Sequence, residues 1–163
     1  MPNANFPLVS IVKGMSFIHV CLPDLENLGK VDGPLKSLEG NYNDSSKELD
    51  EGWQTGLVLS HFYVPLGVDK EGRELLRVRM FGSEEDPATG SAASALSSYL
   101  ALSSKDAIAE GTRKFTYLLT QGVEMGRKSE IGVEVVLNEG GDGVTSVCLS
   151  GTAVKVMEGT LEV

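Results

Sequence analysis

The chain has 163 residues, 41% of them hydrophobic and 23% charged, which is enough for one globular domain, residues 1–163, with its own core. Its formal net charge of −9 argues against a nucleic-acid partner, because affinity for a phosphate backbone comes from clustered Lys and Arg side chains. No apolar run approaches the length of about 18 residues that a membrane-spanning helix needs, and the N-terminus lacks a basic and apolar leader. We therefore expect a soluble cytoplasmic protein with no membrane partner.

Runs of β-branched and aromatic residues, bounded by turn residues, predict that most of the chain is β-structure. The expected strands are two short ones within residues 8–22, broken at Gly14, and one each at residues 55–68, 73–81, 113–122, 131–139, 144–159 and 160–163. Short helices are expected near residues 23–31 and 105–111. Residues 33–52 carry many turn formers and almost no apolar periodicity, so we expect a surface loop there.

A longer helix is predicted within the stretch EEDPATGSAASALSSYLA, Glu84 to Ala101. From Ser91 to Leu102 there is no charged residue in about three helical turns, so this helix is expected to be covered on most of its circumference. Its small Ala and Ser side chains let neighbouring backbone approach closely. Together with the strand-rich remainder, this pattern predicts an α+β fold in which a curled β-sheet wraps around a central helix.

The start of this helix has more than one candidate cap. Asp86 could be the N-cap, with Pro87 as the first helical residue, because Asp accepts hydrogen bonds from first-turn N–H groups and Pro has no N–H. Alternatively, Thr89 or Gly90 is the cap and EEDPA is a loop that leads into the helix. In either case the free N–H groups and the helix dipole favour an anion. Capping alone explains the pattern, so spacing by itself does not require an active site.

Other reactive side chains have ordinary structural interpretations. His19 and His61 lie in apolar strands, which is more typical of buried structural histidines than of catalytic bases, although His61 could face a cleft. Arg127 could bind a substrate carboxylate bidentately or pair with a structural partner. Cys21 and Cys148 are far apart in the sequence and show no metal or disulfide spacing, so we expect no metal site and two buried thiols in a reducing compartment.

Several segments resemble the PhzF-like family of phenazine-biosynthesis proteins. The octapeptide EDPATGSA, residues 85–92, is similar to the family signature, with RMF before it and SSYL after it. VSIVKGMSFIHVCL, TQGVEMGRKSEIGVEV and VCLSGTAVKVMEGTL resemble the first strands, a strand–turn–strand segment and the last hairpin of the family's second, C-terminal domain. The chain resembles only this second domain. The family's first domain, which carries a general acid/base glutamate and a nearby histidine, has no counterpart in the 163 residues.

The resemblance implies a diaminopimelate-epimerase-like fold, in which curled mixed sheets wrap around central helices and the active site lies between two domains. It also implies a cofactor-independent isomerase that transfers protons on a small carboxylated molecule. By position, Asp86 matches a catalytic aspartate that contacts the substrate and assists proton relay. Ser91, with the N–H groups of Gly90 and Ser91, matches the helix start that holds a substrate oxygen or carboxylate. Thr89 and Glu85 of the same signature are further candidate substrate-binding residues.

The absence of a first-domain counterpart affects the expected partners. A single domain provides only half of the cleft, so we expect either a homodimer or a partner chain that resembles the first domain. The alternative hypothesis is a catalytically inactive domain that binds a small anion or a protein. A third hypothesis is a split or truncated product whose other half is encoded separately.

Overall fold

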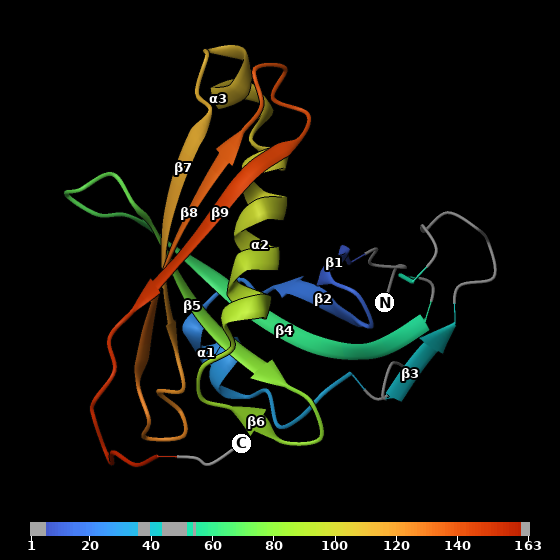
Figure 1. Ribbon diagram of the computed structural model, residues 1–163, viewed down its shortest axis with the longest axis vertical. Helices are drawn as coiled ribbons and strands as arrows, with labels where there is room; N and C mark the ends of the chain where they lie inside the picture. The colour runs from blue at the N-terminus through green and yellow to red at the C-terminus, as the bar shows by residue number, and fades with distance from the viewer. Residues whose placement is uncertain (1–5, 36–39, 44–51, 54, 161–163) are drawn as a thin grey trace.

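The structure is a computed structural model that describes residues 6–35, 40–43, 52–53 and 55–160 (Figure 1). The strands are β1 (Leu8–Val12), β2 (Met15–Cys21), β3 (Gly40–Asn43), β4 (Thr55–Val68), β5 (Glu74–Phe81), β6 (Glu85–Asp86), β7 (Lys114–Gln121), β8 (Ser129–Leu137) and β9 (Val144–Gly151). The helices are α1 (Leu25–Gly29), α2 (Gly90–Ser103) and α3 (Lys105–Ala109). None of these helices is both long and apolar enough to cross a membrane.

The strands form one mixed sheet in the order β1-β2-β4-β5-β7-β8-β9, with β3 paired to β4 and β6 paired to β5. The pairs β2–β4 and β5–β7 are parallel, and the other pairs are antiparallel. Each parallel pair is joined by a crossover connection, and the connection between β5 and β7 contains α2 and α3. This connection places the start of α2 beside the ends of β5 and β7.

The sheet curls around α2, which Figure 1 shows at the centre with β7, β8 and β9 on one side and β1 and β2 on the other. The helix contacts strands from both ends of the sheet order. Its buried residues are all uncharged and mostly small: Ala92, Ala93, Ser94, Ala95, Leu96, Ser97, Ser98 and Ala101. These short side chains allow the sheet to come close on several sides at once. The predicted α+β fold, a curled mixed sheet around a central helix, is confirmed.

The outer face of the sheet is covered near α1. Asp24 caps this short helix by accepting a hydrogen bond from the Asn27 N–H at 2.8 Å, and Leu28 is fully buried. Leu28 packs in a cluster with residues of β2, β4 and β5, including Ile18 and Phe62. Because β2 is covered on both faces, five consecutive residues from Ser16 to Val20 are buried, rather than every second one.

Two segments differ from the sequence expectation. Residues 40–43, expected within a loop over residues 33–52, form β3, because backbone pairing along β4 does not require an apolar side-chain pattern. Residues 36–39 and 44–51 lie outside the described part. The strand expected over residues 144–159 ends at Gly151, because Gly151 pairs with Ile131, close to the start of its partner strand β8 at Ser129. Residues 152–160 have no regular structure, and residues 161–163 lie outside the description.

The expectation of two buried thiols is wrong. Cys21 and Cys148 are both free and exposed. Cys21 is the last residue of β2, beyond the covered part of that strand, and Cys148 lies on β9, whose residues are all exposed at the end of the sheet.

His19 and His61 are both buried, as their apolar strands predicted, and they form a pair between β2 and β4 that the sequence did not predict. His19 and His61 stand opposite each other in the parallel register, with their Nδ1 atoms 3.1 Å apart, so one ring donates to the other. Both side chains are almost completely removed from water. Burial lowers the pKa of His19 to about 3 and holds the pKa of His61 well below its usual value, with His19 as a smaller second cause for His61.

This pair predicts a loss of stability in mild acid. The unfolded chain binds a proton at each histidine below about pH 6.5, whereas the folded chain resists protonation down to about pH 3 at His19. The two histidines therefore cause no pH-dependent loss of stability above about pH 6.5, and the free energy of unfolding falls as the pH drops below that value. We expect the free energy of unfolding to drop by about 3 kcal/mol between about pH 7.5 and about pH 5.5, measured by urea unfolding.

The control is the double variant His19→Gln/His61→Gln, which has no imidazole. Its stability should change little over the same pH interval, because carboxylates titrate mainly below it. The single variant His19→Gln should show about half of the pH dependence. The interpretation is incorrect if the double variant loses as much stability as the original chain.

Candidate functional site

Residues 82–89, which contain most of the signature EDPATGSA, connect β5 to α2 and are called the signature loop. The short strand β6, which contains Glu85 and Asp86, pairs with the end of β5. The N-cap of α2 is Thr89, whose backbone is extended with φ −118° and ψ 92°. The sequence left three candidate N-caps open, and the structure selects Thr89. Asp86 lies three residues earlier, in β6. The Thr89 hydroxyl does not cap the helix but donates to Asp86 Oδ2 at 2.8 Å.

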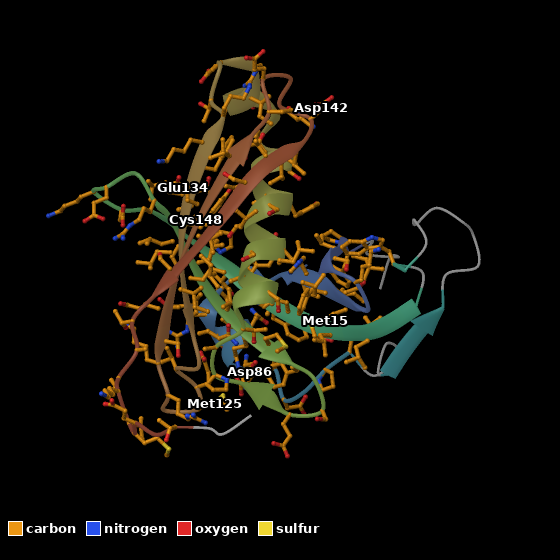
Figure 2. The ribbon with its side chains drawn as sticks, in the orientation of Figure 1. Met15, Asp86, Met125, Glu134, Asp142 and Cys148 are labelled. Atoms are coloured by element: carbon orange, nitrogen blue, oxygen red, sulfur yellow. The ribbon has the colours of Figure 1, made fainter. Side chains whose placement is uncertain are left out.

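Asp86 is half-buried at the N-terminal end of α2 (Figure 2). Its Oδ1 accepts a hydrogen bond from the Ala88 N–H at 3.1 Å, and its Oδ2 accepts the bond from Thr89. The carboxylate is thus oriented by the loop that follows it. It does not accept a hydrogen bond from the first turn of the helix, which leaves that turn open.

The first turn of α2 presents unused donors. The Ala93 N–H binds Thr89 O at 3.0 Å, but the N–H groups of Gly90, Ser91 and Ala92 have no acceptor among the described residues. The Ser91 side chain is half-buried, with its hydroxyl 3.9 Å from Met15 Sδ. Free N–H groups at the positive end of a helix dipole can bind a carboxylate or phosphate.

Glu85 has a different environment from Asp86. Arg79 Nε lies 2.7 Å from Glu85 Oε1, and Arg79 Nη2 lies 2.7 Å from Oε2, a bidentate ion pair. Arg79 Nη1 also donates to Val31 O at 2.6 Å and to Leu28 O at 3.0 Å. Both carboxylate oxygens of Glu85 are therefore occupied, and a ligand contact from Glu85 would compete with Arg79.

Gln121, the last residue of β7, was missed by the sequence reasoning. It is fully buried, and its side-chain amide binds the signature loop at three points. Oε1 accepts from the Thr89 N–H at 3.1 Å, while Nε2 donates to Asp86 O at 2.6 Å and to Thr89 Oγ1 at 3.1 Å. The sequence held a signal: in KFTYLLTQ, Gln121 occupies an inward position that continues the alternation of Phe115, Tyr117 and Leu119.

A pocket of about 560 Å³ adjoins the helix start on the side of β8 and β9. Its lining includes Gly90, Lys128, Ser129, Ser150, Thr152 and Val154. This volume suits a small molecule. A Cβ atom at Gly90 would lie only 2.7 Å from Leu149 Cδ2, so glycine allows Leu149 to rest against the helix start at the pocket wall.

The remaining candidates are less closely tied to this site. The Arg127 guanidinium is exposed and has no partner within the described part, while its backbone N–H donates to Gly122 O at 2.8 Å. Lys128 Nζ lies 2.7 Å from Glu130 Oε1 at the pocket rim. The described residues contain no group of three or more His, Cys, Asp or Glu side chains that could hold a metal ion.

Comparisons with known proteins agree with the architecture. The family model "Phenazine biosynthesis-like protein" matches residues 55–159, which include the whole signature loop. No curated protein matches the chain. Among solved structures, the chain is similar to the phenazine biosynthesis protein of Bacillus anthracis, PhzF family, with 19% identity and a TM-score of 0.53. The match covers 93% of this chain and 47% of that one, so the chain spans about half the length of this relative.

The Arg79–Glu85 pair gives a test of the structural role of Glu85. Because the two side chains are only 8% and 13% exposed, replacing Arg79 by Met leaves a buried carboxylate without its partner. We expect Arg79→Met to lower the free energy of unfolding by about 3–5 kcal/mol. The double variant Arg79→Met/Glu85→Gln should lose clearly less than the sum of the single variants, measured by urea unfolding.

The matched control is the same cycle on Lys114 and Glu134, an ion pair whose side chains are 60% and 39% exposed. Its coupling should stay below about 1 kcal/mol, because water screens exposed pairs. A coupling between Arg79 and Glu85 that is no larger than this control would contradict the structural role of Glu85.

Proposed function

The chain belongs to the phenazine biosynthesis-like protein family, and we propose that it forms one wall of an isomerase-type site for a small carboxylated molecule. The observation that carries the proposal is the arrangement at the start of α2. There, Asp86 is oriented by Ala88 and Thr89 directly before N–H groups that have no acceptor among the described residues. A base and an anion site in one short loop are what proton transfer beside a carboxylate requires.

In this proposal the substrate carboxylate binds at the N–H groups of Gly90 and Ser91. The helix dipole favours the negative charge, and the Ser91 hydroxyl adds a donor. The adjoining pocket, with hydroxyl groups from Ser129, Ser150 and Thr152 and apolar carbon from Leu149 and Val154, accommodates the rest of the molecule.

The proposed reaction moves a proton within the substrate. A carboxylate base, with Asp86 as its member in this chain, removes a proton from a carbon next to the bound carboxylate. The electron pair moves onto the carboxylate oxygens, where the N–H groups of α2 stabilise the developing charge. The proton is then returned to another carbon or to the other face, so no oxidant, reductant or cofactor is consumed.

A second unit completes the cleft in this proposal, either another copy of the chain or a partner chain that corresponds to the remainder of the solved relative. Two observations support an unfilled surface beside the pocket. Leu149 on the last strand is 51% exposed, and Val154, Val156 and Met157 in the following segment are 87%, 83% and 85% exposed. Exposed apolar side chains beside the outer edge of the last strand favour association.

A second candidate function is a non-catalytic domain that binds a small carboxylate or a protein. The observation in its favour is the 47% coverage of the solved relative, which leaves half of that protein without an equivalent here. An anion site at α2 would serve this function equally well, so binding alone does not separate the two candidates.

A test for catalysed proton exchange separates the two candidate functions. Small carboxylic acids incubated with the protein in D₂O should gain deuterium at carbon, detected by loss of proton NMR signals. Asp86→Asn should reduce the rate by about 100-fold or more, because it removes the proton acceptor but keeps the shape. The control is Asp142→Asn, a substitution in the β8–β9 turn at the opposite end of the molecule (Figure 2). This variant should incorporate deuterium into the acid at the original rate.

Equal rates for the original chain and Asp86→Asn would remove Asp86 from the reaction. Carboxylate binding without any deuterium incorporation would favour the non-catalytic candidate instead.

A further inference from the structure

The geometry points to Gln121 as a positioning residue of this site, which acts through Thr89 on Asp86 and on the first N–H groups of α2. This inference rests on the function proposed above. Gln121 itself does not face the unused donors, since both ends of its amide are engaged by the signature loop.

The orientation of the Gln121 amide follows from its partners. The atom nearest Asp86 O lies 2.6 Å from it and must be a donor, because two carbonyl oxygens at that distance would repel each other. The other end then accepts the Thr89 N–H. One buried amide therefore binds the backbone on both sides of Pro87 and Ala88 and holds the loop at a set length and angle.

The Thr89 hydroxyl links Gln121 to Asp86 by two further hydrogen bonds. This hydroxyl accepts from Gln121 Nε2 at 3.1 Å and has a single proton, which it donates to Asp86 Oδ2 at 2.8 Å. The chain of donors runs from Gln121 through Thr89 to Asp86. It orients the Asp86 carboxylate as an acceptor, and the same Thr89 is the residue from which α2 starts.

The neighbouring Gly122 shows how closely β7 approaches the loop. Its φ of +73° suits glycine, and a Cβ atom there would lie 2.8 Å from Pro87 O and 3.1 Å from Pro87 Cα. The same Cβ would lie 2.5 Å from Arg127 O. The loop is thus bound by Gln121 and supported by the Gly122 backbone, so a change at Gln121 is transmitted to Asp86 and Gly90.

A role in positioning and a role in stability alone predict different results. If Gln121 only stabilises the fold, its removal lowers the free energy of unfolding but leaves the affinity of the folded protein for a carboxylate unchanged. If it positions the loop, the affinity falls as well, because the N–H groups and Ser91 no longer converge on one point. A variant destabilised at a distant site separates the two roles.

The experiment uses the whole ¹⁵N-labelled chain and benzoate as a single-carboxylate probe, with the amide shifts of Gly90, Ser91 and Ala92 as the readout. Gln121→Met keeps the size but removes all three hydrogen bonds, and Thr89→Val removes only the hydroxyl. We expect each to weaken benzoate binding by about tenfold, the effect of one lost hydrogen bond near a charge. Thr89→Ser keeps the hydroxyl and should bind within about twofold.

The matched control is Val135→Ala, a fully buried position in β8 that does not belong to the loop. It should lower stability and leave benzoate affinity unchanged. Unchanged affinity in folded Gln121→Met, or a loss in Val135→Ala as large as in Gln121→Met, would overturn the inference. If Gln121→Met does not fold, Thr89→Val against Thr89→Ser decides in the same way.

A measurement without ligand separates this inference from the proposed function. In the free protein, Gln121→Met should speed hydrogen exchange at the Thr89 amide and shift the Gly90 and Ser91 amide signals more than Val135→Ala does. No benzoate response in the original chain, together with these changes, would remove the anion site but keep the positioning role. Unchanged Gly90 and Ser91 signals in Gln121→Met would remove the positioning role itself.

Discussion

The burial of α2 is the constraint on which the rest of the structure depends. A helix with no charged side chain from Gly90 to Ser103 is stable in this fold because strands from both ends of the sheet cover it. The sheet must therefore curl, and the crossover that contains the helix joins two neighbouring parallel strands, β5 and β7. As a result, the helix starts where β5 and β7 end, and the last residue of β7, Gln121, reaches the loop before the helix.

The same constraint gives three consecutive carboxylates different environments. Glu84 is exposed, Glu85 is held by Arg79, and Asp86 is oriented by Thr89 and Ala88. Neighbours in sequence are therefore not equivalent candidates for a reaction. Only Asp86 lies on the same hydrogen-bonded loop as the N-cap of α2, so the chemistry proposed for this chain depends on a single carboxylate and on the loop that orients it.

Much of the fold could be predicted from the sequence, because apolar patterns report burial directly. The strand expected over residues 55–68 is β4 to the residue, and the chargeless helix lies at the centre of the sheet. Features that depend on partners far along the chain were harder to predict. Residues 40–43 pair with β4 through their backbone, and β9 ends at Gly151 because its partner strand β8 begins there. The signature located the candidate site, but Gln121 was missed because its contacts with the signature loop join residues 32 and 35 positions apart.

We propose that this chain provides one wall of a site that a second unit completes. A dilution series tests this proposal. At each protein concentration, sedimentation velocity gives the mass under the conditions of the exchange reaction, and the rate of deuterium incorporation is measured in parallel. If a second unit completes the site, deuterium incorporation per chain should fall in step with the fraction of chain present in an assembly. A rate per chain that stays constant while the mass falls to that of one chain would mean that one chain suffices for the reaction.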